Sequence, residues 1–87
     1  MEKIMDLTRE QFDGFENSKN QVKFAKELLG IDTKAKLGVG DTATLIDNSK
    51  ALEVYKKTFS DGTFTYYIVI EPMDERAAMC YTLYHKY

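Results

Sequence analysis

Cys80 and His85 are the side chains of this sequence best suited to nucleophilic or metal chemistry, and each residue type occurs once. A catalytic cysteine needs a base close enough to accept its proton. The two residues are five positions apart, so they point to opposite faces of a strand and lie about 140° apart on a helix. Without a second Cys or His, no Cys/His zinc cluster is possible. We expect Cys80 to be a small buried hydrophobic residue and His85 to lie on the surface.

Pairs of carboxylates are the remaining route to catalysis or metal binding. Asp41 with Asp47, or Asp74 with Glu75, could bind a divalent cation, but their spacing does not match a calcium loop. Asp47 suits a turn, and Asp74 suits a turn or a helix start. The segment 38–40 resembles part of a phosphate-binding loop, but the third glycine is missing and strand-forming residues follow it. We therefore predict a non-enzymatic protein with no cofactor and no metal site.

The tyrosines are more informative, because all six lie from Tyr55 onward. Tyrosine combines a large contact area, a small loss of conformational entropy and a polar hydroxyl, so a tyrosine-rich sheet face suits protein binding or base stacking. The structural alternative is that most of them complete a small sheet core. The candidate protein-binding residues are two tyrosines and two carboxylates that would meet basic groups of a partner: Tyr67, Tyr84, Asp74 and Glu75.

Lysines offer a second kind of surface. Three of them, between positions 19 and 26, have the spacing that places side chains on one helix face. A solvated outer face explains such a pattern, and a phosphate-contacting face is the alternative. Lysines from the later hairpin would join them in a nucleic-acid site. The candidate nucleic-acid-binding residues are Lys19, Lys23, Lys26, Lys56 and Lys57.

The composition limits the classes of protein. The chain has 87 residues, begins with Met and reads as one domain. Its 12 basic and 14 acidic residues give a net charge of −2, which disfavours a nucleic-acid binder that depends on its overall field. The charged N-terminus lacks the apolar core of a signal peptide, and the apolar runs are too short to cross a membrane. We expect a cytoplasmic protein with no membrane contact.

Helical signals occupy residues 7–30. Thr8 and Gln11 have the spacing of a capping box, and Leu7 and Phe12 fall at the two positions of a hydrophobic staple. These residues predict a helix start. A bend or a kink follows near position 14.

A second helix start follows the first closely. Ser18 and Gln21 repeat the capping-box spacing, and an apolar stripe between Val22 and Leu29 follows them. Gly30 supplies a C-terminal cap. We expect a short helix, a bend and a longer helix, with one continuous kinked helix as the alternative.

The strongest strand signal is the hairpin around Asp61-Gly62. A two-residue turn would place Phe59 opposite Phe64. A three-residue turn with Gly62 in the left-handed conformation would instead place Val54 on the same face as Ile68. The sequence leaves both registers open.

The remaining strand signals lie on either side of the hairpin. Residues 32–41 read as a loop leading into a strand at 42–46, which a turn at 47–49 would join to the hairpin as a three-stranded meander. Pro72 ends the third strand. Residues 73–87 contain helix formers and then strand formers, and we favour a turn at 72–76 and a fourth strand from about Ala78. In that strand Met79, Tyr81 and Leu83 would share one face, and Cys80, Thr82 and Tyr84 the other.

The predicted fold is therefore α+β, with an N-terminal helical segment (about 7–30) packed on an antiparallel β-meander of three or four strands (about 42–87). The predicted function is a small non-catalytic module that binds a larger protein. Proteins of this size class include phage- or mobile-element-encoded inhibitors of host defence nucleases, which we take as the example. The alternative is a single-stranded nucleic-acid-binding protein that uses the lysines and exposed tyrosines. A homodimer formed through a sheet edge is the third possibility.

Overall fold

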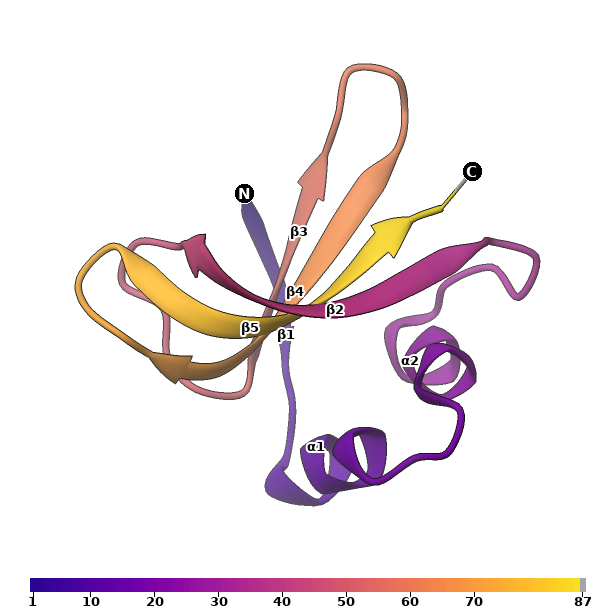
Figure 1. Ribbon diagram of the computed structural model, residues 1–87, viewed down its shortest axis with the longest axis horizontal. Coiled ribbons are helices and arrows are strands. Elements are labelled where there is room, and N and C mark those ends of the chain that lie inside the picture. Colours follow the sequence, from indigo (N-terminus) through magenta and orange to yellow (C-terminus); the bar gives the residue numbers. More distant parts are fainter. Residues whose placement is uncertain (87) are drawn as a thin grey trace.

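The protein is described by a computed structural model of residues 1–86, which contains two short helices and a five-stranded antiparallel sheet (Figure 1). The α+β class is confirmed, although the sheet has five strands where three or four were predicted. In chain order the elements are β1 (Glu2–Asp6), α1 (Arg9–Glu16), α2 (Gln21–Leu29), β2 (Leu37–Leu45), β3 (Glu53–Thr58), β4 (Phe64–Pro72) and β5 (Ala77–His85). Tyr87, the end of the predicted β-rich part, lies outside the described residues.

The order of strands across the sheet is β1-β3-β4-β5-β2. Strands β3, β4 and β5 form a meander, but β2 pairs with β5 at the far edge. The predicted pairing of residues 42–46 with the hairpin is therefore wrong. The segment 46–52 crosses the end of the sheet instead, where the Ile46 N–H donates to the Arg76 carbonyl (2.6 Å) and the Leu52 N–H to the Val69 carbonyl (2.9 Å).

Two strand boundaries differ from the predictions. The N-terminal residues, for which no strand was expected, form β1 and pair with β3. Four of the five β1 residues are exposed, so this strand lacks the apolar alternation that marks a half-buried strand. In addition, β2 begins at Leu37 and includes the two glycines that were read as a loop. The predicted start of the β-rich part at residue 42 is therefore too late.

The hairpin adopts the three-residue register. Val54 pairs with Ile68, the Phe59 N–H donates to the Thr63 carbonyl (2.8 Å), and Gly62 has a φ of 87°. A left-handed residue at this position costs little only for glycine. The turn chemistry therefore selects one of the two registers that the sequence left open.

Two separate helices form, as the first of the two predictions stated. The capping box of α1 is present: the Gln11 N–H donates to Thr8 Oγ1 (3.1 Å) and the Thr8 N–H to Gln11 Oε1 (2.9 Å). The cap of α2 is Asn20 rather than the predicted Ser18, because the Asn20 side chain accepts the Lys23 N–H (3.1 Å). Gly30 ends α2 with a φ of 68°, as predicted.

The sheet buries apolar side chains on both faces. On the face that both helices cover, which we call the helix face, side chains from α1 and α2 pack on β3, β4 and β5 (Figure 1). The buried members of this core are Leu7, Phe12, Phe15, Ala25, Val54, Tyr66, Ile68 and Leu83. A smaller core lies on the opposite face, which we call the second face, and consists of Ile46, Val69, Ala78 and Cys80. The predicted alternation along β5 is confirmed, since Leu83 and Tyr81 pack in the first core and Cys80 lies in the second.

None of the helices within residues 1–86 is long and apolar enough to cross a membrane.

Candidate functional site

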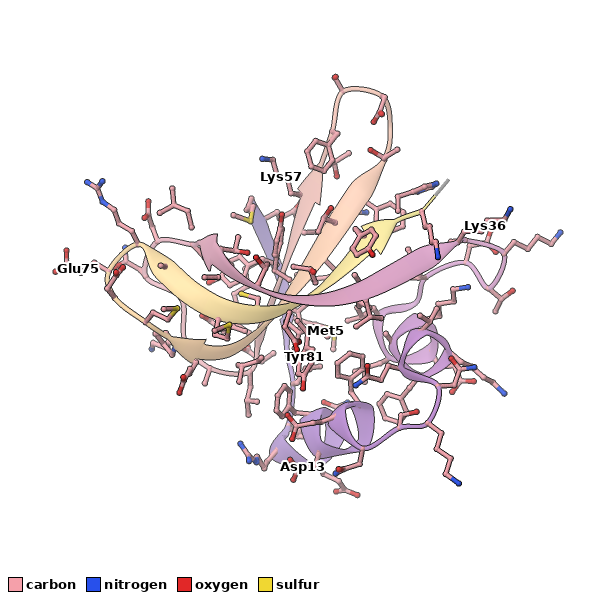
Figure 2. The ribbon with its side chains drawn as sticks, viewed as in Figure 1. Met5, Asp13, Lys36, Lys57, Glu75 and Tyr81 are labelled. Atoms are coloured by element: carbon pink, nitrogen blue, oxygen red, sulfur yellow. The ribbon has the colours of Figure 1, made fainter. Side chains whose placement is uncertain are left out.

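The four predicted protein-binding residues lie at two distant places. Tyr67 and Tyr84 lie on neighbouring strands on the second face, because Tyr67 pairs with Thr82. Asp74 and Glu75 lie in the turn between β4 and β5, and Figure 2 shows Glu75 at the tip of that turn. Five residues of strand separate the level of Tyr67 from the start of β5, which is about 17 Å. The four residues therefore do not form one patch.

Asp74 has a structural role in its turn. Its Oδ1 accepts the backbone N–H groups of Arg76 and Ala77, both at 2.8 Å. These two hydrogen bonds lower the pKa of the Asp74 carboxyl below its ordinary value. A carboxylate already bonded by its own turn is less available to a partner. Glu75, in contrast, is exposed.

The two tyrosines also differ. Tyr67 is half-buried and packs against the core of the second face, where burial raises the pKa of its hydroxyl. Tyr84 is 44% exposed. Its ring lies over Gly38 of the neighbouring strand, in the space that a Cβ at Gly38 would occupy. The glycine therefore makes room for the ring, which places an exposed aromatic side chain on top of β2.

The five predicted lysines are not on one surface. Lys23 and Lys26 line a shallow pocket of about 340 Å³ along α2, and the Lys26 ammonium donates to the Thr33 carbonyl (2.9 Å). Lys56 lies over the Phe64 and Tyr66 rings on the helix face. Lys57, the next residue on β3, points to the opposite face and lies over the Phe59 ring. Lys19 precedes α2 and is exposed.

Cys80 and His85 do not form a catalytic pair. Cys80 is fully buried on the second face, as predicted, and burial raises the pKa of its thiol to about 11. His85 is half-buried rather than on the surface, because its ring packs edge-on against Phe64 with 5.6 Å between the ring centres. Within residues 1–86, no group of three or more His, Cys, Asp or Glu side chains is placed to hold a metal ion.

Glu53 is a buried carboxylate that sequence reasoning missed. It is only 8% exposed, and its Oε1 accepts the Lys50 N–H (2.5 Å) and the Tyr55 hydroxyl (3.0 Å). Its Oε2 pairs with the Lys3 ammonium (2.7 Å). Lys3, and then the other two donors, hold the pKa of the Glu53 carboxyl below its ordinary value despite burial. Because its partners are groups of the same chain, Glu53 serves to fasten β1 and the end of the crossover to β3.

The open edge of β2 is the second feature that sequence reasoning missed. In an antiparallel pair, the residues that exchange hydrogen bonds alternate along each strand. The Ile46 N–H bonds to Arg76 and the Lys86 N–H bonds to Lys36, so the even-numbered residues of β2 bond to β5. The odd-numbered residues therefore direct their N–H and C=O groups to the open edge. These are Leu37, Val39, Asp41, Ala43 and Leu45.

The two edges of the sheet differ in how they are protected. The edge strand β1 is five residues long, is charged and contains a bulge between Lys3 and Met5. Short length, charge and bulges are the common devices that prevent edge-to-edge pairing. The edge strand β2 is nine residues long, pairs in continuous register with β5 and contains no Lys, Arg or Pro. Its second half is mostly exposed, including 63% of Leu45. Only β2 therefore has the features of an edge that can accept another strand.

Comparison of the chain with protein-family models, with curated proteins and with solved structures finds no match.

Proposed function

We propose that this chain is a non-catalytic protein-binding module that binds an extended segment of a larger protein along β2. The observation that carries the proposal is the contrast between the protected edge at β1 and the nine-residue edge at β2, whose second half is mostly exposed. Strand addition of this kind supplies affinity through main-chain hydrogen bonds and specificity through alternating side chains.

Further support comes from the surroundings of β2. The exposed Tyr84 ring lies on the second face of this strand, and aromatic side chains with a polar tip are enriched in protein interfaces. Of the two tyrosines predicted to bind a protein, Tyr84 belongs to the proposed site together with the edge of β2, and Tyr67 does not. Inhibition of a host defence nuclease stays a prediction, since it rests on the size class of the protein.

The test uses two substitutions at one position. Ala43 is exposed, and its N–H points to the open edge. Ala43→Pro removes that donor while leaving the bonds to β5 in place, which edge strands tolerate. Ala43→Val keeps the donor and suits a strand, so it is the matched control. Thermal unfolding of each variant checks that the fold is retained.

The assay is an affinity pull-down from the lysate of the native host, with and without nuclease treatment. The proposal expects a specific protein to be retained by the wild type and by Ala43→Val and to be lost with folded Ala43→Pro. Equal retention by Ala43→Pro would refute binding at β2. Recovery that disappears after nuclease treatment would favour the nucleic-acid alternative and its lysines.

A further inference from the structure

One carboxylate lies on the edge strand β2 and a second lies near its neighbour Tyr81, both on the helix face. Asp41 is exposed in the middle of β2 and pairs with Tyr81 of β5. The Tyr81 hydroxyl donates to Glu16 Oε2 at 3.2 Å, and Figure 2 shows Tyr81 pointing from the sheet toward the helices. Burial and the charges of both carboxylates raise the pKa of the Tyr81 hydroxyl. The negative charges of Asp41 and Glu16 therefore both reach the Tyr81 hydroxyl.

Within residues 1–86, neither of these carboxylates forms an ion pair. The ion pairs found within residues 1–86 are Lys3–Asp6, Lys3–Glu53 and Arg9–Asp13, and they involve neither Asp41 nor Glu16. Glu16 is also the last residue of α1, whose final turn contains no basic side chain. The carbonyl groups at a helix C-terminus carry partial negative charge, so they add to the field of the two carboxylates.

The second face beside β2 has a different character. Gly38 and Gly40 have no side chains, and the Tyr84 ring covers Gly38. A Cβ at Gly40 would lie 3.4 Å from Thr82 Oγ1, so the Thr82 side chain lies close to the space beside Gly40 on this face. A side chain from a strand added next to β2 would reach the edge of the Tyr84 ring without passing a β2 side chain. An aromatic or aliphatic group fits such a contact.

We propose that the segment bound at β2 carries a lysine or arginine opposite Asp41 on the helix face and an apolar or aromatic residue beside Tyr84 on the second face. This inference rests on the proposed strand addition. Cross-strand neighbours on one face lie close enough to interact, and opposite charges there are favourable. The basic side chain would pair with Asp41 and extend toward Glu16.

A second copy of this chain fits the edge less well. Two β2 strands paired antiparallel over their full length would bring the two Asp41 carboxylates opposite each other, because Asp41 is the central residue of β2. Like charges directly opposite each other are destabilising. The charge of the edge therefore favours a partner of different sequence with a basic residue.

The test is selection of binders from a displayed library of random nine-residue peptides, matching the length of β2. Enriched peptides are synthesised and titrated against the wild type, Ala43→Pro, Asp41→Lys and Glu75→Lys. The last variant is the control, because Glu75 is an exposed carboxylate at the far turn. We expect enriched peptides with one central basic residue. We also expect affinity to fall about tenfold or more with Asp41→Lys and to be unchanged with Glu75→Lys.

The outcomes separate this inference from the proposed function. Two outcomes would overturn the inference and leave strand addition in place. In the first, peptides that fail to bind Ala43→Pro contain no basic residue. In the second, peptides that fail to bind Ala43→Pro bind Asp41→Lys with the same affinity as the wild type. Peptides that bind Ala43→Pro as well as the wild type, or no enrichment at all, would overturn both. Light scattering of the free chain adds a further check. A dimer that Ala43→Pro dissociates would show that a second copy occupies the edge, and would overturn the inference.

Discussion

Replacing the buried carboxylate Glu53 by glutamine tests how much the hydrogen bonds to this side chain stabilise the start of β3. Glutamine keeps the shape of the side chain, and its oxygen can still accept the Lys50 N–H and the Tyr55 hydroxyl. Hydrogen bonds to a charged acceptor are roughly twice as strong as those to a neutral one, so each bond loses about 1 kcal/mol. Lys3 is partly exposed, so water replaces the lost ion pair at little cost. We therefore expect Glu53→Gln to reduce the free energy of unfolding by about 2 kcal/mol.

For a domain of this size, that loss corresponds to a fall of about 8–16 °C in the midpoint of thermal unfolding. The effect should depend on pH in a defined direction. The pKa of Glu53 is lowered in the folded chain, so its charge stabilises the fold fully above its ordinary value of 4.5. As the pH falls below that value toward the folded pKa, the carboxylate becomes protonated and the contribution is lost. The difference between wild type and Glu53→Gln should be complete at neutral pH and should shrink in acid.

The assay is urea unfolding of both proteins at a series of pH values, followed by circular dichroism. Glu75→Gln is the control, because that carboxylate is exposed in a turn, and we expect it to change the free energy of unfolding little at any pH. A Glu53→Gln variant as stable as the wild type at neutral pH would refute the role assigned to Glu53. A difference that stays undiminished in acid would refute the electrostatic part of the argument.

Three further predictions concern single positions. Because Cys80 is fully buried and its thiol pKa is raised to about 11, iodoacetamide at neutral pH should label it at a measurable rate only in denaturant, and rapid labelling of the native chain would contradict its placement. Gly38→Ala should stabilise a Tyr84→Ala background by about 0.5–1 kcal/mol and give no such gain in the wild type, where the added methyl displaces the ring. Equal effects in the two backgrounds would exclude that contact. Thr8→Ala should cost about 1 kcal/mol in urea unfolding through loss of the α1 cap, and an unchanged midpoint would contradict the capping box.

The features that could be predicted from the sequence depend on residues a few positions apart. The capping box at Thr8, the end of α2 at Gly30 and the left-handed turn at Gly62 each act within one turn of chain. Their chemistry is the same wherever the segment lies in the fold. For this reason the two helices and the hairpin were placed correctly.

The errors concern which segments meet in space. The turn at 47–49 shows that the chain reverses, but it does not show that the next strand lies three strands away, at the other side of β4 and β5. The meaning of Gly38 depends on Tyr84, a residue on a strand much later in the chain. Read alone, glycine indicates a loop, whereas beneath an aromatic ring it is compatible with a strand.

In the candidate site too, the feature that depends on residue type was predicted, and the feature that depends on the arrangement of strands was missed. Sequence reasoning found Tyr84, since tyrosine is recognisable by type, but it grouped Tyr84 with the distant turn at Asp74 and Glu75. The edge was missed because a strand becomes an edge only through the order of strands in the sheet. One signal was available in the sequence, namely that residues 37–45 contain no Lys, Arg or Pro.

The contrast between the two edges carries more weight than either edge alone. Both belong to one small sheet and meet the same solvent and the same risk of unwanted pairing, so the general hazard of open strands cannot explain why only one of them is protected. The protection at β1 comes from its charged residues and its bulge, and Lys3 is further held by Glu53. At β2, α2 contacts part of the strand, while the exposed stretch from Asp41 to Ala43 offers backbone groups and the Asp41 carboxylate. An edge left open beside a charge and an aromatic ring has the chemistry of a binding surface, which is why we propose that a partner binds there.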